Sequence, residues 1–363
     1  MKKRKARKAR KGPSVDKEMK TLMRISSENE KAVARKRPKE EPPLNLVTGG
    51  CGRLGRYLVK ALAERGERVR VLQHSKGSWE GCPKGVEIAS GDLLDKASLE
   101  KAAEDVDYVY HLAALVNPEA RFEELLDVNY RGTRNLLEAC RDKSYHLKRF
   151  IFISSISVYG KEPAEIPADE ETGLNPTDNY GKSKMMAEEA VGQYGDKIPY
   201  VILRPAVIYG EGFDEAYLSV LSALKKGRMS ILGDGNNNIP FIHATDVVQA
   251  MLLASRAERA VGNTYVIAPE DNMTQKQVFA LACKHLGTSP PIGHSWLWLV
   301  KLRLKFARLF GKPKITEDYI DILTSNRRFN IDRAKEDIGF KPKVKLDDGI
   351  QEMVEYYRSK GGK

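Results

Sequence analysis

The sequence predicts an α/β fold in which a parallel sheet carries helices on both of its faces. Short apolar stretches alternate with helical ones from Leu44 onward, and the first apolar stretch ends in a cluster of glycines directly before a helix. Such nearly continuous apolar strands, separated by helices, are typical of parallel sheets, because both faces of the sheet are buried. A hydrophobic content of 41% and a charged content of 30% are ordinary for a globular chain of 363 residues.

The predicted elements follow one another in regular order. The run LNLVT at 44–48 predicts a buried strand, and residues 53–65 predict a helix that turns its leucines inward and stops at Gly66. Helices are also expected near Ser98 and through Asn135 and Leu136. The later predicted strands are 68–73, 86–89, 107–114, 149–155 and 201–210. This alternation predicts a Rossmann-like, doubly wound parallel sheet.

Three regions are expected along the chain. Residues 1–43 are predicted to be a basic, disordered tail, and residues 44–210 a dinucleotide-binding core. Residues 211–363 are predicted to form mainly a smaller C-terminal substrate lobe, with 241–268 returning to the core. Ligands of open α/β sheets bind beyond the carboxyl ends of the strands, so we expect the lobe to cover that edge.

The basic character of the chain lies in the tail. Residues 1–43 hold 16 of the 61 Lys and Arg residues but only 6 of the 49 Asp and Glu residues, so the remaining chain is nearly neutral. The tail has no apolar run, and we expect no secretory signal in it. Two roles stay open for the tail, a disordered extension without a specific partner, or contact with an anionic membrane or nucleic acid.

The cysteines and the apolar runs bear on the compartment. Cys51, Cys82, Cys140 and Cys283 are widely spaced, with no C-x-x-C pair and no nearby set of histidines, so no metal site is predicted. A reducing, cytoplasmic compartment is expected, with peripheral membrane contact as an option. No apolar run reaches the eighteen residues of a membrane span, so no transmembrane segment is predicted.

The glycine cluster TGGCGRLG predicts a dinucleotide site. Gly49, Gly52 and Gly55 stand between a strand and a helix, where glycine permits a tight turn and lets backbone N–H groups approach the phosphates. Arg53 and Leu54 open the helix and belong to the same predicted site. A glycine motif alone is weak evidence, but this position in the strand–turn–helix order strengthens it.

The second strand bears on the choice of cofactor. A carboxylate at its end would hold the ribose of NAD, but the strand ends in Gln73 and His74, followed by Lys76. With Arg53 nearby, this pattern favours NADP over NAD, although Gln73 is also suited to a ribose hydroxyl. Asp92, with Leu93 beside it, is placed in the cofactor site, where a carboxylate can accept a bond from the adenine amino group; a turn or cap role stays open for Asp92.

A tyrosine and a lysine stand four residues apart in YGKSK, on one face of a predicted helix. Tyr180 is a weak base at neutral pH unless a cation such as Lys184 stabilises its phenolate. The pair gains meaning because Ser154 and Ser155 end a predicted central strand upstream. The sequence therefore predicts a proton-transfer site.

These motifs together resemble the extended short-chain dehydrogenase/reductase family, which includes nucleotide-sugar epimerases, dehydratases and 3β-hydroxysteroid-type dehydrogenases. The resemblance runs from about Leu44 to Arg358. Its landmarks, in order, are TGGCGRLG, GDLLD, HLAA, VNYRGTRNLLEA, SSISVYG, YGKSK, LRPAVIYG, GDG, FIHATDVV and RRFNIDRAKEDIGFKP.

The resemblance implies roles for individual residues. Ser155 would hydrogen-bond the substrate oxygen, Tyr180 would exchange its proton, and Lys184 would hold the nicotinamide ribose and lower the tyrosine's pKa. Ser154 would support Ser155, and Asn129 falls at the family's catalytic asparagine. Ala113 and Ala114 of the HLAA motif would line the cofactor path. The resemblance also implies a homodimer.

Two departures separate the chain from sugar-nucleotide members of the family. Those members carry an asparagine where this chain has Val207, and an arginine where it has Ile239. Because a diphosphate binds less well without its guanidinium partner, both departures favour a dehydrogenase. Arg327 and Arg328 are candidates to bind an anionic group of the substrate. Alternatively, one of them links the lobe to the core.

Two further segments call for an interpretation. The run SWLWLVKLRLKFARLF at 295–310 contains no acidic residue and, drawn as a helix, gathers its basic residues on one side. It is either a helix buried in the lobe or an interfacial helix at a membrane surface or at the mouth of an apolar pocket. In the second segment, Thr245 or Asp246 is expected to start the helix that runs through Val248 and Met251, and His243 is not predicted to be catalytic.

The sequence thus predicts an NAD(P)-dependent oxidoreductase that transfers hydride between the cofactor and a hydroxyl or ketone of a mostly apolar, sterol-like or lipid-like substrate. A nucleotide-sugar epimerase or dehydratase with bound NAD is the first alternative. A non-catalytic dinucleotide sensor is the second, and the complete set of Ser155, Tyr180 and Lys184 argues against it.

Overall fold

A computed structural model describes residues 41–74, 79, 81–117, 120–309 and 317–362. Within this range, the described chain from Pro43 onward forms one unit by itself. The basic tail and Lys76 lie outside the described residues.

Seven parallel strands form the central sheet, in the order β11-β6-β5-β4-β1-β2-β3. The strands are β1 (Leu44–Thr48), β2 (Arg68–Gln73), β3 (Glu87–Ser90), β4 (Tyr108–His111), β5 (Arg149–Ile153), β6 (Tyr200–Pro205) and β11 (Thr264–Ile267). The order reverses beside β1, so the crevice at a topological switch point opens where β1 and β4 end. The predicted Rossmann-like sheet is confirmed.

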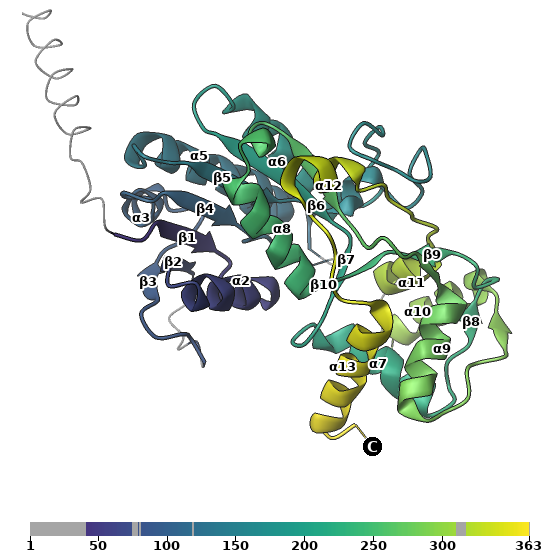
Figure 1. Cartoon of the computed structure of the whole chain (residues 1–363). Coiled ribbons are helices and arrows are strands. Elements are labelled where there is room, and N and C mark those ends of the chain that lie inside the picture. Colours follow the sequence, from purple (N-terminus) through teal and green to yellow (C-terminus); the bar gives the residue numbers. More distant parts are fainter. Residues whose placement is uncertain (1–40, 75–78, 80, 118–119, 310–316, 363) are drawn as a thin grey trace, which may run out of the picture. The chain divides into compact units, whose positions relative to one another are not determined.

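Helices cover both faces of the sheet (Figure 1). One face packs against α2 (Arg53–Glu64) and α8 (Ala244–Arg256), with α12 (Asp332–Ile338) beside them. The other face packs against α3 (Lys96–Ala102), α5 (Gly132–Lys143) and α6 (Asn179–Gln193). Buried leucines such as Leu58 and Leu62 on one side and Leu136 on the other give each face its own apolar core.

The C-terminal part builds a third apolar core around short strand pairs. β7 (Val207–Tyr209) pairs with β10 (Phe241–His243), β8 (Ile231–Leu232) with β13 (His294–Ser295), and β9 (Asn238–Ile239) with β12 (Met273–Thr274). The surrounding helices are α7 (Asp214–Lys225), α9 (Gln275–Leu286), α10 (Leu297–Leu309), α11 (Glu317–Thr324) and α13 (Leu346–Ser359). Between these segments the chain returns to the main sheet, where β11 pairs with β6.

The predicted start of α8 needs a correction. The helix begins at Ala244, and the His243 ring is its cap, because Nδ1 accepts a bond from the Thr245 N–H at 3.3 Å. Asp246 instead accepts bonds from the N–H groups of Lys343 and Val344, at 2.9 and 3.1 Å. Histidine is an unusual cap, so residue preference pointed to Thr245 or Asp246.

Candidate active site

The glycine turn after β1 forms a cradle with the backbone that follows β4. Gly49 has a φ of +70°, and a Cβ atom there would lie 2.7 Å from the Ala113 nitrogen. A Cβ atom at Gly55 would lie 2.1 Å from the Gly49 carbonyl oxygen. Gly52 is the N-cap of α2 and offers no side chain to the first-turn N–H groups. These groups are left for an anion, so the turn fits the pyrophosphate of a dinucleotide.

Side chains at the ends of β2 and β3 meet beside this turn. His74 Nε2 lies 3.0 Å from Asp92 Oδ2, and both side chains are substantially exposed. The other Asp92 oxygen accepts the Leu94 N–H at 2.9 Å, so the residue also shapes its own turn. Leu93 is buried in the core, so its side chain has a packing role. Its backbone carbonyl accepts a bond from the Asn135 side chain at 3.0 Å. Arg53 is exposed and Leu54 partly buried on the first turn of α2.

A buried polar chain supports the cradle, and sequence reasoning missed it. The Thr48 hydroxyl lies 2.7 Å from His111 Nδ1, and His111 Nε2 lies 2.8 Å from the Thr133 hydroxyl. Because the Thr133 hydroxyl donates to the Asn129 carbonyl at 2.6 Å, Nε2 must donate to Thr133 and Nδ1 must accept from Thr48. The Thr48 oxygen then accepts the Ala113 N–H at 3.2 Å. The signal for this hydrogen-bonded chain in the sequence was His111, a histidine within a predicted buried strand.

The imidazole in this chain is held neutral. His111 is buried, and burial, with a smaller effect from Lys184, lowers the pKa of His111 to about 3. A neutral ring with one donor and one acceptor suits a one-directional hydrogen-bonded chain. His111 therefore positions Ala113 and the loop that faces the glycine turn.

Asn129 is buried and connects two segments near the glycine turn. Its amide oxygen accepts the Leu115 N–H at 2.7 Å, and its nitrogen donates to the Leu115 carbonyl and to the Ser183 hydroxyl, at 3.1 and 2.9 Å. Ser183 in turn donates to the Tyr180 carbonyl at 2.7 Å. Asn129 lies in the π-helix Leu126–Arg131 and links the loop after β4 to α6, and its catalytic role stays a prediction.

Ser155 and Tyr180 meet where α6 packs closely against the turn after β5. Ser155 caps the short helix Ile156–Tyr159, and its oxygen accepts the Ser157 N–H at 3.1 Å. A Cβ atom at Gly181 would lie 2.5 Å from the Ser157 carbonyl oxygen, so only glycine permits this approach. The Ser155 hydroxyl is then close enough to Tyr180 to act on the pKa of its phenol, which it lowers.

Lys184 is almost fully buried on the same helix. Its Nζ lies 4.1 Å from the centre of the Phe152 ring, an attractive cation–π distance. Burial lowers the pKa of Lys184 to about 7, and the Glu188 carboxylate opposes this shift. The neighbouring Ser154 hydroxyl is buried and has no hydrogen-bond partner in the described part of the chain. An unpaired buried hydroxyl here fits a polar ligand such as the cofactor.

The pKa of Tyr180 differs from the expectation that Lys184 would lower it. Burial and the Asp178 carboxylate raise the pKa of Tyr180, and the Ser155 hydroxyl opposes them. Lys184 is not among the described groups that shift this pKa. The tyrosine of the protein alone is therefore a protonated hydroxyl, suited to donate a proton to a developing alkoxide.

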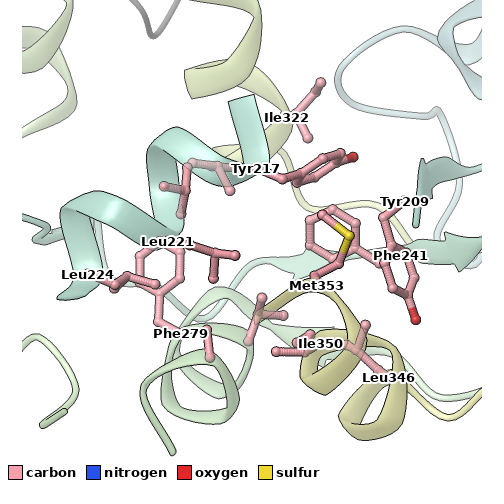
Figure 2. Close-up of a pocket in the computed structure, with 14 residues that line it drawn as sticks. Tyr209, Tyr217, Leu221, Leu224, Phe241, Phe279, Ile322, Leu346, Ile350 and Met353 are labelled. Atoms are coloured by element: carbon pink, nitrogen blue, oxygen red, sulfur yellow. The ribbon is translucent and has the colours of Figure 1, made fainter. Parts of the chain in front are cut away.

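The C-terminal part encloses an apolar cavity of about 80 Å³. Figure 2 shows side chains of α7, α9, α11 and α13 gathered around Tyr209 and Phe241 of the β7–β10 ribbon. Val207 is the register partner of Phe241 on that ribbon, and Ile239 is buried in the same core. The two positions that separate the chain from sugar-nucleotide members thus lie in an apolar environment.

The segment at 295–310 divides its side chains between the lobe and solvent. Leu297, Val300 and Leu304 pack against the lobe core. Trp296 and Trp298 are 72% and 62% exposed. As far as its side chains are described, to Leu304, the segment thus packs one side against the lobe core, and an interfacial role for the exposed side stays a prediction.

The described residues offer neither a metal site nor a membrane-spanning helix. No group of three His, Cys, Asp or Glu side chains is arranged to hold a metal ion there. None of the helices in the described range has the length and apolar content needed to cross a membrane.

Comparison with known proteins gives the family. The model of the NAD dependent epimerase/dehydratase family matches residues 45–268. The 2-alkyl-3-oxoalkanoate reductase of Stenotrophomonas maltophilia is 26% identical over 85% of this chain and 97% of its own length. The 3beta-hydroxysteroid-dehydrogenase/decarboxylase isoform 2 of Arabidopsis thaliana is 28% identical over 86% of this chain and 61% of its own length.

A solved structure agrees with these matches. The Thermus thermophilus UDP-glucose 4-epimerase in complex with NAD has a TM-score of 0.68 and 26% identity, over 87% of this chain and 99% of that one. The matched region contains the glycine cradle, Ser155, Tyr180 and Lys184. The chain belongs to the NAD-dependent epimerase/dehydratase family and is an NAD-dependent oxidoreductase of the extended short-chain dehydrogenase/reductase type.

Proposed function

We propose that the protein transfers hydride between a nicotinamide cofactor and a secondary hydroxyl or ketone of a mostly apolar substrate. The meeting of Ser155, Tyr180 and Lys184 at the end of β5 carries this proposal. The bound nicotinamide would supply or accept the hydride. Ser155 would orient the substrate oxygen, Tyr180 would give it a proton in the reductive direction, and Lys184 would bind the nicotinamide ribose.

Three observations support an apolar substrate. Val207 and Ile239 replace polar side chains that a sugar diphosphate would need. The ribbon that carries Val207 also forms one wall of the apolar cavity. The 2-alkyl-3-oxoalkanoate reductase among the relatives acts, by its name, on an alkyl substrate with a ketone.

We further propose NADP in preference to NAD. His74, rather than a carboxylate, follows β2, and Arg53 is exposed on the first turn of α2. A cation at either position would attract the extra phosphate of NADP. A larger kcat/KM with NAD than with NADP would contradict this preference.

We also propose that the start of α10 contacts an anionic membrane surface through Trp298 and through Trp296, the residue directly before the helix. These two exposed rings are of the kind that prefers the membrane–water interface. Residues 272–316 contain eight Lys and Arg residues and no Asp or Glu, so the charge of the segment complements anionic lipid headgroups.

A substrate panel tests the catalytic proposal. The panel contains a 3β-hydroxysterol, a long-chain secondary alcohol, a 3-hydroxy fatty acid and UDP-glucose, each supplied with NAD or NADP. We expect net reduction of the cofactor with an apolar alcohol, followed by its ultraviolet absorbance. Tyr180→Phe should lower the rate by about 10²- to 10⁴-fold, whereas Tyr145→Phe, at an exposed site, should not.

The same panel contains the outcome that contradicts the proposal. Conversion of UDP-glucose to its 4-epimer, with no net change in the cofactor and no reaction of the apolar alcohols, would favour the epimerase alternative. The similarity to the Thermus thermophilus epimerase is the observation that keeps this alternative open.

A further inference from the structure

A buried arginine lies beside the proposed catalytic helix and is poorly satisfied by the protein. Arg327 is 6% exposed, and its Nε has no hydrogen-bond partner among the described residues. The two carboxylates that act on it electrostatically are those of Asp178 and Asp321. A buried guanidinium normally needs several acceptors, because its five N–H donors lose their bonds to water.

Both neighbouring carboxylates are occupied by other donors. Asp178 caps α6, and its Oδ1 accepts the Gly181 N–H at 2.7 Å. Asp321 is paired with Lys161 and with Lys301, the latter at 3.0 Å. Burial lowers the pKa of Arg327 to about 10, against the attraction of the two aspartates, so the protein does not compensate fully for burying this charge.

The backbone places Arg327 between the catalytic helix and the lobe. Its N–H donates to the Asn238 carbonyl at 3.1 Å, next to Ile239 on β9. Two residues later, the Phe329 ring packs against Tyr159 with ring centres 5.6 Å apart. Asp178 is the N-cap of α6 and precedes Tyr180 by two residues. Arg327 therefore follows α11, whose residues Ile322 and Leu323 line the apolar cavity, and lies near enough to the N-terminus of α6 for the Asp178 carboxylate to act on its charge.

We propose that Arg327 binds a carboxylate of the substrate. This inference rests on the proposed function and extends it, because the substrate then joins an apolar part to an acid group near the reacting hydroxyl. A carboxylate offers two coplanar oxygens that match the guanidinium fork. With Asp178 and Asp321 nearby, a single arginine balances one negative charge better than the charges of a diphosphate.

Binding of a matched pair of ligands tests the proposal. 3-Hydroxydecanoate and its methyl ester are titrated calorimetrically against the full-length protein with cofactor present. We expect the acid to bind at least about tenfold more tightly than the ester, since each 1.4 kcal/mol is a factor of ten. Arg327→Met should abolish this preference, and Arg327→Lys should retain part of it. Arg328→Met, which changes an exposed neighbour, should leave it unchanged.

Stability separates a ligand-binding role from a structural one. Without ligand, Arg327→Met should have a melting temperature equal to or above that of the wild type, because an uncompensated charge is removed. A large decrease would show that Arg327 is a structural partner of Asp178 and Asp321 and would overturn the proposal. Equal binding of acid and ester, no binding of the acid, or a preference that survives Arg327→Met would overturn it as well.

The two proposals fail in different ways. If the protein oxidises neutral alcohols in a reaction that depends on Tyr180 but shows no preference for the acid, the proposed function holds and the carboxylate site is refuted. Tight binding of the acid through Arg327, without hydride transfer from any alcohol of the panel to the cofactor, would do the reverse.

Discussion

At the residue scale, burial of the Lys184 ammonium links chemistry to stability. Burial lowers the pKa of Lys184 to about 7, whereas an unfolded chain holds a lysine proton up to a pKa of about 10.4. Between these values the unfolded state binds more protons than the folded state. The free energy of unfolding should therefore rise with pH across this window, and below it the Lys184 contribution should no longer change with pH.

Replacing Lys184 by methionine should separate the two effects. Lys184→Met should be more stable than the wild type below pH 7, and its advantage should shrink as the pH rises toward about 10. Hydride transfer should fall by about 10²- to 10⁴-fold. Chemical unfolding across the pH range checks the first statement, with Lys182→Met, at an exposed site on the same helix, as the control. A pH-independent difference would refute the assignment.

Gly55 lies so close to the backbone of the glycine turn that no side chain fits there. A Cβ atom there would lie 2.1 Å from the Gly49 oxygen, which is backbone and cannot move aside without opening the turn. Gly55→Ala should lower cofactor affinity by about tenfold or more, roughly the effect of losing one hydrogen bond to a charged group. Gly173→Ala meets no atom within 4 Å and serves as the control. Fluorescence titration with the reduced cofactor measures both, and equal affinities would contradict the cradle.

The candidate catalytic residues are easier to find in the sequence than the contacts around them. Ser155, Tyr180 and Lys184 stand in motifs whose spacing is local, so the pattern alone pointed to them as candidates. The contacts of Asn129 with Leu115 and Ser183 join segments that are 14 and 54 residues apart. No local pattern encodes such pairings, and these contacts of Asn129 became visible only in the folded chain.

At the element scale, α10 presents one packed side and one exposed side. Replacing both Trp296 and Trp298 by alanine should weaken binding to anionic phospholipid vesicles by roughly tenfold or more, because each ring would bury a large apolar area at the interface. Stability should change little, since both side chains are mostly exposed. Vesicle co-sedimentation measures the effect, with Tyr145→Ala, another exposed aromatic, as control. Unchanged binding would mean that α10 does not contact lipid.

The elements of the core were predictable because strands such as β1 and β5 are nearly continuous apolar runs, β2 alternates apolar with polar residues, and the helices between them show their own period. The two-residue strands β8, β9, β12 and β13 were not, since two residues carry no periodicity. The cap of α8 shows a different limit. His243 caps the helix because its ring is held between Tyr57 and Tyr209, with ring centres 6.4 and 5.2 Å away, and this environment depends on tertiary packing.

At the scale of the whole molecule, charge and chemistry occupy different parts of the chain. Every proposed catalytic and cofactor-binding residue lies in the unit from Pro43 onward, which forms its own cores. Residues 1–43 carry 16 Lys and Arg against 6 Asp and Glu. A tail of this composition attracts anionic surfaces over about one Debye length, roughly 8 Å at physiological salt, and the attraction fades as salt is added.

Deleting residues 1–42 should therefore leave kcat/KM for the cofactor within about twofold of the full-length value, an expectation that follows from the location of the site. The same deletion should remove the salt-sensitive part of binding to anionic vesicles, whereas the part due to Trp296 and Trp298 should persist at high salt. Vesicle binding of both proteins, titrated with sodium chloride, separates the two contributions. The double tryptophan variant should show the opposite pattern, with binding at low salt and little at high salt. Loss of hydride transfer on deletion would show that the tail takes part in the active site.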